Sequence, residues 1–321
     1  MDVPVPLRPP ALRPGDTVRL VSPSGPTRPE RVARGVDLLT GWGLRVEVSA
    51  NAYARTGFLA GPDADRLADL NGALADPAVR AVVCTRGGYG TQRIVDGLDM
   101  AAVRADPKLV VGFSDITALH IAIHRRTGLP TIYGNGLVGV GAPETSEFTR
   151  ERLLATLRGE AGAEVPRNPD DQYLRAISGG FATAQLRGGC LWLVLQTMGT
   201  PWEIDLDSAI FFFEDYKAPP YYVDGMLTQL RHAGKLGSVA GVVVGEMKDC
   251  DWGDARPVSD WARSRSLEDV LEEHLEPLGV PVLYGLPLGH GKHLASIPLG
   301  VRYTLDADRR TLTLEEPLFE A

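Results

Sequence analysis

The first 135 residues alternate between short apolar runs and segments with helical spacing of apolar side chains, and this alternation constrains the fold most strongly. The runs that predict strands cover residues 17–22, 45–48, 79–84, 109–111 and 131–134. Predicted helices between them include residues 29–42 and 64–74, a short helix over 94–98, and residues 116–124. Such an alternation predicts an α/β fold with a parallel sheet and right-handed crossovers. Ligands bind at the carboxyl ends of the strands in sheets of this kind.

A polar, irregular stretch divides the chain in two. It covers residues 159–180 and includes Pro166, Asn168 and Pro169, a composition typical of an interdomain linker. Beyond it, two glycines at 188–189 lead into an apolar run over 191–198. Strand patterns cover 208–213, 240–245 and 282–284, helical patterns cover 223–232 and 267–275, and a hairpin covers 303–314. We therefore predict a first domain over residues 1–160, a linker over 161–181 and a second α/β domain over 182–321.

Charge and cysteine content exclude several classes of partner. The 321 residues carry a net charge of −8 without a long basic cluster, so we expect neither nucleic acid nor a membrane surface as a partner. No apolar run approaches the roughly 20 residues that cross a bilayer. Cys84, Cys190 and Cys250 are odd in number and far apart, which predicts free thiols in a reducing compartment. We expect a cytoplasmic protein that binds a small or zwitterionic ligand.

A serine occupies the sharp turn between a predicted strand and a predicted helix. Ser114 follows the apolar run 109–111 and precedes the helical pattern that starts at Ile116. A hydroxyl there lies above the carboxyl end of the sheet, beside backbone N–H groups that stabilise an anion, as an acyl-transfer nucleophile requires. The alternative is an ordinary helix cap, because Ile116 stands where the G-x-S-x-G motif has glycine.

Glycines gather in the loop after the strand 79–84. Gly87, Gly88 and Gly90 allow positive φ angles and bring backbone N–H groups close to a ligand, although a plain turn also explains them. The loop 22–26 after the first strand lacks the G-x-G-x-x-G spacing of a dinucleotide site. Both loops and Ser114 follow strands of one parallel sheet, so we expect all three at the same sheet edge.

A serine nucleophile needs a base, and His290 is the best placed of the six histidines. It ends the stretch 285–290, which we predict to be a glycine- and proline-shaped loop after a strand, where a histidine faces either a cleft or solvent. Helix faces or helix C-termini explain four others: His120, His124, His232 and His274. His120 and His124 have the spacing of a metal pair, but no H-E-x-x-H motif supports a metal site.

A carboxylate that orients the base is expected at the end of the apolar strand 208–213. Glu214 and Asp215 both lie there, and their side chains point to opposite faces, so only one can meet His290. Phe212 shares the face of Glu214, whereas Phe211 and Phe213 share that of Asp215, so hydrophobicity does not choose between the two. A second acidic group is predicted to be a solvated loop rather than a metal site: Glu246, Asp249, Cys250, Asp251 and Asp254.

Four motifs follow one another along the chain: Arg86-Gly87-Gly88-Tyr89-Gly90, Gly112-Phe113-Ser114-Asp115-Ile116-Thr117, Phe213-Glu214-Asp215 and Gly285-Leu286-Pro287-Leu288-Gly289-His290. Together they resemble the LD-carboxypeptidase family of serine peptidases, which includes the microcin C immunity peptidases. The resemblance extends from Arg13 to Gly300, nearly the whole chain.

The resemblance implies a Ser-Glu-His triad. Ser114 corresponds to the nucleophile, His290 to the general base and then acid, and Glu214 to the residue that orients the base. The backbone N–H groups of Gly88 and Asp115 correspond to the oxyanion hole. It further implies a Rossmann-like first domain, a smaller α/β second domain with the site between them, no metal or other cofactor, and a homodimer.

Three functions follow as hypotheses. The first is a serine carboxypeptidase that cleaves an L–D peptide bond, releasing terminal D-alanine from cytoplasmic murein tetrapeptide during cell-wall recycling. The second keeps the triad but hydrolyses a peptidyl- or aminoacyl-nucleotide of the microcin C type, which confers self-immunity. The third is a ligand-binding protein without catalysis.

Four aromatic residues either stack on a nucleobase or belong to the core: Trp192, Trp202, Tyr221 and Tyr222. Cys190 stands where the family resemblance leads us to expect asparagine.

Overall fold

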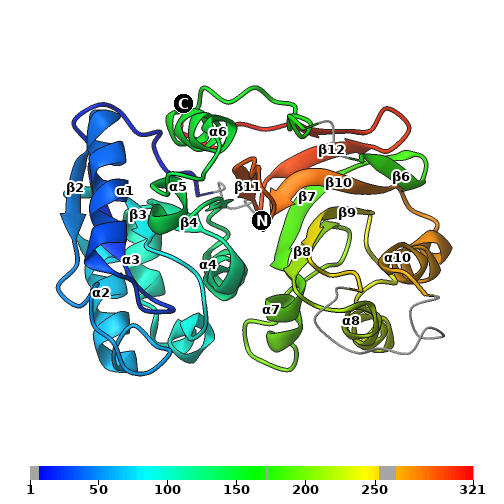
Figure 1. Cartoon of the computed structure of the whole chain (residues 1–321), viewed down its shortest axis with the longest axis horizontal. Helices are drawn as coiled ribbons and strands as arrows, with labels where there is room; N and C mark the ends of the chain where they lie inside the picture. Colours follow the sequence, from blue (N-terminus) through cyan, green and yellow to red (C-terminus); the bar gives the residue numbers. More distant parts are fainter. Residues whose placement is uncertain (1–6, 171–172, 253–264, 321) are drawn as a thin grey trace, which may run out of the picture.

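Two β-sheets with flanking helices lie side by side in the computed structural model of the chain (Figure 1). The structure describes residues 7–170, 173–252 and 265–320. Among these residues, no helix is both long and apolar enough to cross a membrane. Asp254, one of the acidic residues singled out above, lies outside the described residues.

The first sheet confirms the predicted parallel arrangement. Its order is β11-β5-β4-β3-β1-β2, and all neighbours are parallel except the pair β11 and β5. The strands are β1 (Thr17–Val21), β2 (Arg45–Val48), β3 (Val79–Cys84), β4 (Leu109–Gly112), β5 (Thr131–Tyr133) and β11 (Ile297–Leu299). The helices of this unit are α1 (Pro29–Gly41), α2 (Asp63–Ala75), α3 (Met100–Ala105), α4 (Thr117–Thr127), α5 (Leu137–Val140) and α6 (Glu147–Arg158). Every residue of β4 is buried, as expected for a strand covered on both faces.

The region between β3 and β4 differs from the single short helix expected over residues 94–98. It forms two 3₁₀ turns, Thr91–Arg93 and Val95–Gly97, and then helix α3. Asp99 is the N-cap of α3, because its side chain accepts hydrogen bonds from the N–H groups of Ala101 and Ala102 (3.0 and 2.9 Å).

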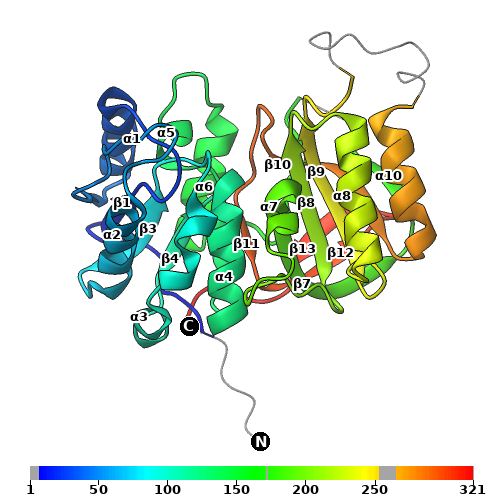
Figure 2. The same ribbon diagram turned by 90° about the horizontal axis from the view of Figure 1, so that it is seen from below.

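The second sheet has the order β13-β12-β7-β8-β9-β10-β6. Its strands are β6 (Arg175–Ser178), β7 (Phe181–Cys190), β8 (Ile210–Tyr216), β9 (Gly241–Lys248), β10 (Val282–Gly289), β12 (Arg302–Asp306) and β13 (Thr311–Leu314). Strands β7 to β10 are parallel, and the outer strands pair antiparallel. Helices α7 (Leu191–Gln196), α8 (Pro220–His232) and α10 (Leu267–Leu275) lie on one side of this sheet (Figure 2).

Strand β8 divides its side chains between two cores. Phe211 and Phe213 pack in a cluster with residues of α8 and α10, whereas Phe212 belongs to a cluster that includes Ile132 and Tyr133 of the first sheet. The Phe212 ring lies edge-on to that of Tyr133, with centroids 5.2 Å apart. A continuous apolar core therefore joins the two sheets.

Two strands cross the domain limits expected from sequence. Strand β6 lies inside segment 161–181, which was expected to be a linker without a strand, and it pairs with β10. Strand β11 comes from the second half of the chain but pairs with β5 in the first sheet. The limits 1–160 and 182–321 remain predictions.

The predicted loop 285–290 is also different. Strand β10 continues to Gly289, so only His290 and the residues after it leave the sheet. Its pairing with β9 shifts between Tyr284 and Gly289, and Gly285 has a φ of +106°, a conformation that few residues other than glycine adopt. The glycines and the proline that suggested a loop therefore belong to an irregular strand.

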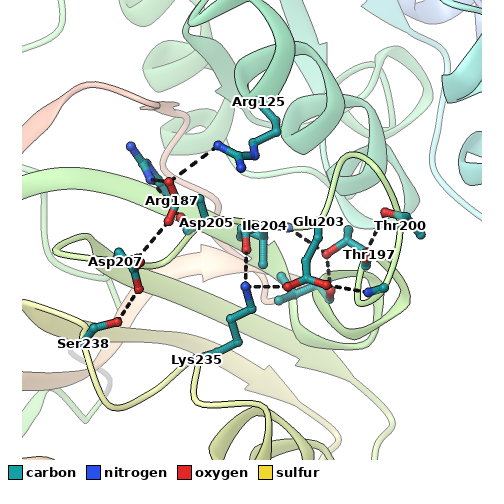
Figure 3. Close-up of polar contacts among 12 residues, drawn as sticks. Arg125, Arg187, Thr197, Thr200, Glu203, Ile204, Asp205, Asp207, Lys235 and Ser238 are labelled. Atoms are coloured by element: carbon teal, nitrogen blue, oxygen red, sulfur yellow. Dashed lines mark hydrogen bonds and ion pairs between the residues drawn. The ribbon is translucent and has the colours of Figure 1, made fainter.

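A polar cluster joins the two units near the end of α4. Asp205 contacts both Arg125 of α4 (3.7 Å) and Arg187 of β7 (3.1 Å), as Figure 3 shows. Lys235 binds the loop that contains Asp205, because its ammonium group contacts Glu203 (2.5 Å) and donates to the carbonyl of Ile204 (3.2 Å). The apolar core and this cluster together hold the two units against each other.

Candidate active site

The two loops and the serine turn meet at one sheet edge, which confirms the predicted location. The N–H of Gly25 donates to the carbonyl of Gly87 (3.4 Å), and the Ser24 hydroxyl donates to Asp115 Oδ2 (2.6 Å). The N–H of Thr91 donates to the same carboxylate oxygen (2.9 Å). The Asp115 side chain, only 1% exposed, therefore ties the serine turn to both loops.

Ser114 has a conformation that sequence alone did not reveal. Its φ is +61°, in the left-handed region that non-glycine residues rarely adopt, and such strain is common at functional sites. Its hydroxyl caps neither the 3₁₀ turn Ser114–Ile116 nor α4. It makes no hydrogen bond to another described residue, so the helix-cap alternative is wrong.

Glycine is required beside this turn. A Cβ on Gly87 would lie 2.9 Å from Ser114 Cβ and 3.1 Å from the carbonyl oxygen of Phe113. Gly88 has a φ of +129°. Within the described part of the chain, the N–H groups of Gly88 and Asp115 donate no hydrogen bond, so both are free to bind an oxyanion.

Two residues that sequence reasoning missed support this turn. Arg66 is 1% exposed, and its guanidinium donates to the carbonyls of Gly90 (2.9 Å) and Pro23. Tyr133 is fully buried at the end of β5, where its hydroxyl accepts from the N–H of Ser114 (3.4 Å) and donates to Glu214 Oε1 (2.6 Å). The only signal for Tyr133 was a hydroxyl group at the carboxyl end of a predicted strand.

Glu214 and His290 are in direct contact. His290 Nδ1–H donates to Glu214 Oε2 (2.6 Å), and the backbone N–H of His290 donates to the same oxygen (3.2 Å). Glu214 is fully buried, and a Cβ on Gly289 would lie 2.5 Å from its Oε2. Burial by itself lowers the pKa of His290, but the charge and hydrogen bond of Glu214 outweigh it, so the pKa is raised. With Nδ1 protonated, Nε2 is the nitrogen that can accept a proton.

Asp215 faces the other way. Its Oδ2 accepts from the N–H of Trp192 in the first turn of α7 (2.9 Å), and its Oδ1 accepts from the N–H of Tyr216 (2.7 Å). Burial raises the pKa of Asp215 to about 6. Among these two neighbours, Glu214 therefore contacts the histidine and Asp215 contacts a helix start.

Ser114 and His290 line the same cavity of about 730 Å³, together with Gly88 and Cys190. Aromatic side chains that are about half exposed form much of its wall: Trp192, Tyr216, Tyr221 and Tyr222. Lys217 is the only lysine or arginine among its described lining residues. Trp202, by contrast, is buried and donates to Asp96 (3.0 Å).

The other candidates lie elsewhere. His120 is buried, and its Nε2–H donates to the carbonyl of Gly112 (2.9 Å), whereas His274 contacts Asp224 (2.8 Å). Glu246 belongs to β9 and not to the expected acidic loop, and burial raises its pKa to about 7. Among the described residues, no group of His, Cys, Asp and Glu side chains is arranged to hold a metal ion.

Comparisons with known proteins identify relatives of the chain. The probable murein peptide carboxypeptidase of Bacillus subtilis (strain 168) is 36% identical over 314 residues, covering 98% of this chain and 96% of that protein. The microcin C7 self-immunity protein MccF of Escherichia coli is 27% identical over 333 residues, covering 94% of each chain.

A solved structure of MccF with glutamyl sulfamoyl guanosine has a TM-score of 0.87 at 24% identity, covering 98% of this chain and 100% of that one. It therefore has the same two-domain α/β fold. The LD-carboxypeptidase N-terminal domain matches residues 18–134, and the LD-carboxypeptidase C-terminal domain matches residues 183–305. Two matched domains that together span most of the sequence, and a relative 36% identical over nearly its full length, show that this chain belongs to the LD-carboxypeptidase family.

Proposed function

We propose that the chain is a serine carboxypeptidase in which Ser114, His290 and Glu214 act as the triad. The observation that carries this proposal is the 2.6 Å contact between His290 Nδ1 and Glu214 Oε2 at the cavity that Ser114 also lines. The contact leaves His290 Nε2 as the proton acceptor and gives the imidazolium a buried counter-charge.

The reaction then has two steps. His290 Nε2 takes the proton of Ser114 as Oγ attacks the scissile carbonyl, and the N–H groups of Gly88 and Asp115 stabilise the oxyanion. The protonated histidine gives its proton to the leaving amine, which departs as a free amino acid. Water, activated by His290, hydrolyses the acyl-enzyme and restores Ser114.

The test of the triad is release of the terminal amino acid by the wild type and by Ser114→Ala, with and without a chelator. We expect full activity with the chelator and a loss of about 10³-fold or more in the variant. Ser208→Ala is the matched control, because Ser208 also has a left-handed φ (+52°) but lies outside the cavity. Full activity of Ser114→Ala, or loss of activity with the chelator, contradicts the proposal.

The proposed substrate is the murein tetrapeptide, from which the enzyme releases D-alanine by cleaving the L–D bond. Support comes from the murein peptide carboxypeptidase named among the relatives. The cavity adds a second argument, because a carboxypeptidase must bind a free terminal carboxylate. Lys217 supplies the one ammonium group along the described cavity wall.

A second candidate keeps the triad and acts on an aminoacyl-nucleotide. The observation in its favour is the aromatic cavity wall, in which Trp192, Tyr221 and Tyr222 are exposed enough to stack on a base. Values of kcat/KM for the tetrapeptide and for an aminoacyl sulfamoyl nucleoside, measured side by side, decide between the two. We expect a preference for the tetrapeptide.

Binding without catalysis is the remaining alternative. It predicts that no covalent intermediate forms, whereas the proposed mechanism predicts an acyl group on Ser114. Mass spectrometry of the protein quenched during turnover distinguishes the two.

We further propose that the protein is a cytoplasmic homodimer that serves in cell-wall recycling, and light scattering of the purified protein tests the dimer.

A further inference from the structure

The imidazole of His290 lies between two aromatic rings. The ring of Tyr216 is stacked on it, with centroids 5.1 Å apart and planes inclined by 11°. Phe113, which precedes Ser114, packs against it at 4.9 Å and 46°. Glu214 fixes one edge of the imidazole through Nδ1, but a nearly parallel ring fixes its plane.

The alternation of β8 explains why Tyr216 reaches this position. Side chains two residues apart on a strand share a face, so Glu214 and Tyr216 both point toward His290 while Asp215 points away. The Tyr216 side chain is 43% exposed and lines the cavity. Burial in the core therefore does not account for this ring.

The face of Tyr216 already attracts a cation. The ammonium nitrogen of Lys217 lies 4.8 Å from its ring centroid. Several charged groups lie near His290. The charges of Glu214 and Asp215 on β8 act on its pKa, and Lys217 lines the same cavity. Glu144 and Lys292 line a smaller cavity that His290 also lines, and Glu246 of β9 lies beside Gly291. The rings of Tyr216 and Phe113 carry no charge. Replacing Tyr216 therefore leaves the number of charges around His290 unchanged, and its effect on the imidazolium can be separated from theirs.

We propose that Tyr216 is a positioning residue for His290, which holds the plane of the imidazole and stabilises the imidazolium through its electron-rich face. This inference rests on the proposed function, because it concerns the proton that His290 takes from Ser114. A cation over an aromatic face at a partly exposed site is favoured by roughly a factor of ten.

The test compares Tyr216→Phe, which keeps the ring, with Tyr216→Leu, which removes it. We measure kcat, KM and the pH dependence of kcat/KM. We expect Tyr216→Leu to lower kcat roughly tenfold with a much smaller change in KM. The acid limb of kcat/KM moves about one pH unit lower, because the His290 imidazolium loses the stabilisation by the aromatic ring and its pKa falls. Tyr216→Phe keeps both values within about twofold of the wild type.

Tyr173→Leu is the matched control. Tyr173 is also exposed (62%) and also has a cation near its ring, Arg175 at 5.6 Å, but it does not line the cavity. We expect its rates and pH profile to match the wild type. Tyr216→Met repeats the test if the leucine variant does not fold.

Two results overturn the inference. One is a folded Tyr216→Leu or Tyr216→Met enzyme whose acid limb stays in place. The other is a Tyr216→Phe variant that loses as much kcat as the leucine variant. If Ser114→Ala is fully active, the proposed function itself fails, whereas an unmoved acid limb in an enzyme that needs Ser114 overturns only the role of Tyr216.

Discussion

Two adjacent carboxyl groups at the end of β8 differ because their side chains point to opposite faces of the sheet. Glu214 is held by three hydrogen bonds, from the Tyr133 hydroxyl and from two nitrogens of His290. Asp215 instead accepts hydrogen bonds from backbone N–H groups in the first turn of α7 and at the last residue of β8. We therefore assign the two residues separate roles, one toward the proposed base and one toward the local backbone.

Glu214→Gln keeps the shape of the side chain but removes the charge that stabilises the imidazolium. We expect kcat to fall by roughly 10²- to 10⁴-fold. Asp215→Asn changes a group that contacts backbone and should cost about tenfold or less, about 1.4 kcal/mol. Steady-state kinetics on the tetrapeptide measure both effects. The reverse order of the two variants would show that the orienting carboxylate is assigned wrongly.

The raised pKa of His290 predicts how activity depends on pH. The base must be neutral, so kcat/KM should rise with pH through a midpoint above about 6.5, the ordinary value for histidine. In Glu214→Gln the midpoint should move to lower pH, because the cation loses its counter-charge. The pH profile of kcat/KM measures both midpoints, and a midpoint below about 6 in the wild type contradicts the prediction.

Lys217 should determine the preference for a free terminal carboxylate. For Lys217→Met we expect the ratio of kcat/KM between a peptide acid and its amide to fall roughly 10- to 100-fold, as expected for a lost hydrogen bond between charged groups. Lys248→Met is the matched control, because Lys248 contacts Asp249 (3.3 Å) and lies outside the cavity. An unchanged ratio in Lys217→Met contradicts this role.

At the scale of elements, the Ser114 turn after β4 contacts the loops that follow β1 and β3. Asp115 in the turn accepts a hydrogen bond from each of the two loops, and the Arg66 side chain of α2 donates a hydrogen bond to each of them. The close approach of Gly87 to Ser114 leaves no room for a side chain. This arrangement predicts that a small change in one loop moves the nucleophile.

Gly87→Ala tests this coupling. A Cβ 2.9 Å from that of Ser114 must push the turn aside, so we expect kcat to fall roughly 10- to 100-fold with the fold retained. Gly72→Ala is the control, because Gly72 lies exposed within α2 with no atom within 4 Å of the added Cβ. That variant should keep full activity and gain about 0.5–1 kcal/mol of stability. Equal activity of the two variants argues against the coupling.

At the scale of the whole molecule, the two sheets share one core and exchange a strand. Phe212 of β8 packs on Tyr133 of β5, and β11 from the second half of the chain pairs with β5. The contact between Asp205, Arg125 and Arg187 adds a polar link at the boundary (Figure 3). These connections predict that the two units unfold together.

We expect a single transition in urea, with coincident curves from far-UV circular dichroism and tryptophan fluorescence. Asp205→Asn, which weakens a partly exposed ion pair, should lower the free energy of unfolding by at most about 1 kcal/mol and leave the transition single. Two separated transitions in the wild type would contradict a shared core.

The sequence by itself determined the parallel first sheet, the sheet edge at which the two loops and Ser114 meet, and the family, because strand periodicity and the four motifs are local patterns. It did not determine which residues would lie next to one another. The contacts of Glu214 with Tyr133 and His290 join residues 81 and 76 positions apart. The left-handed φ of Ser114, the stack of Tyr216 on His290 and the pairing of β11 with β5 also appear only in the tertiary structure. Such contacts depend on how the sheets pack, and hydrophobic periodicity along one segment carries no information about its distant partners.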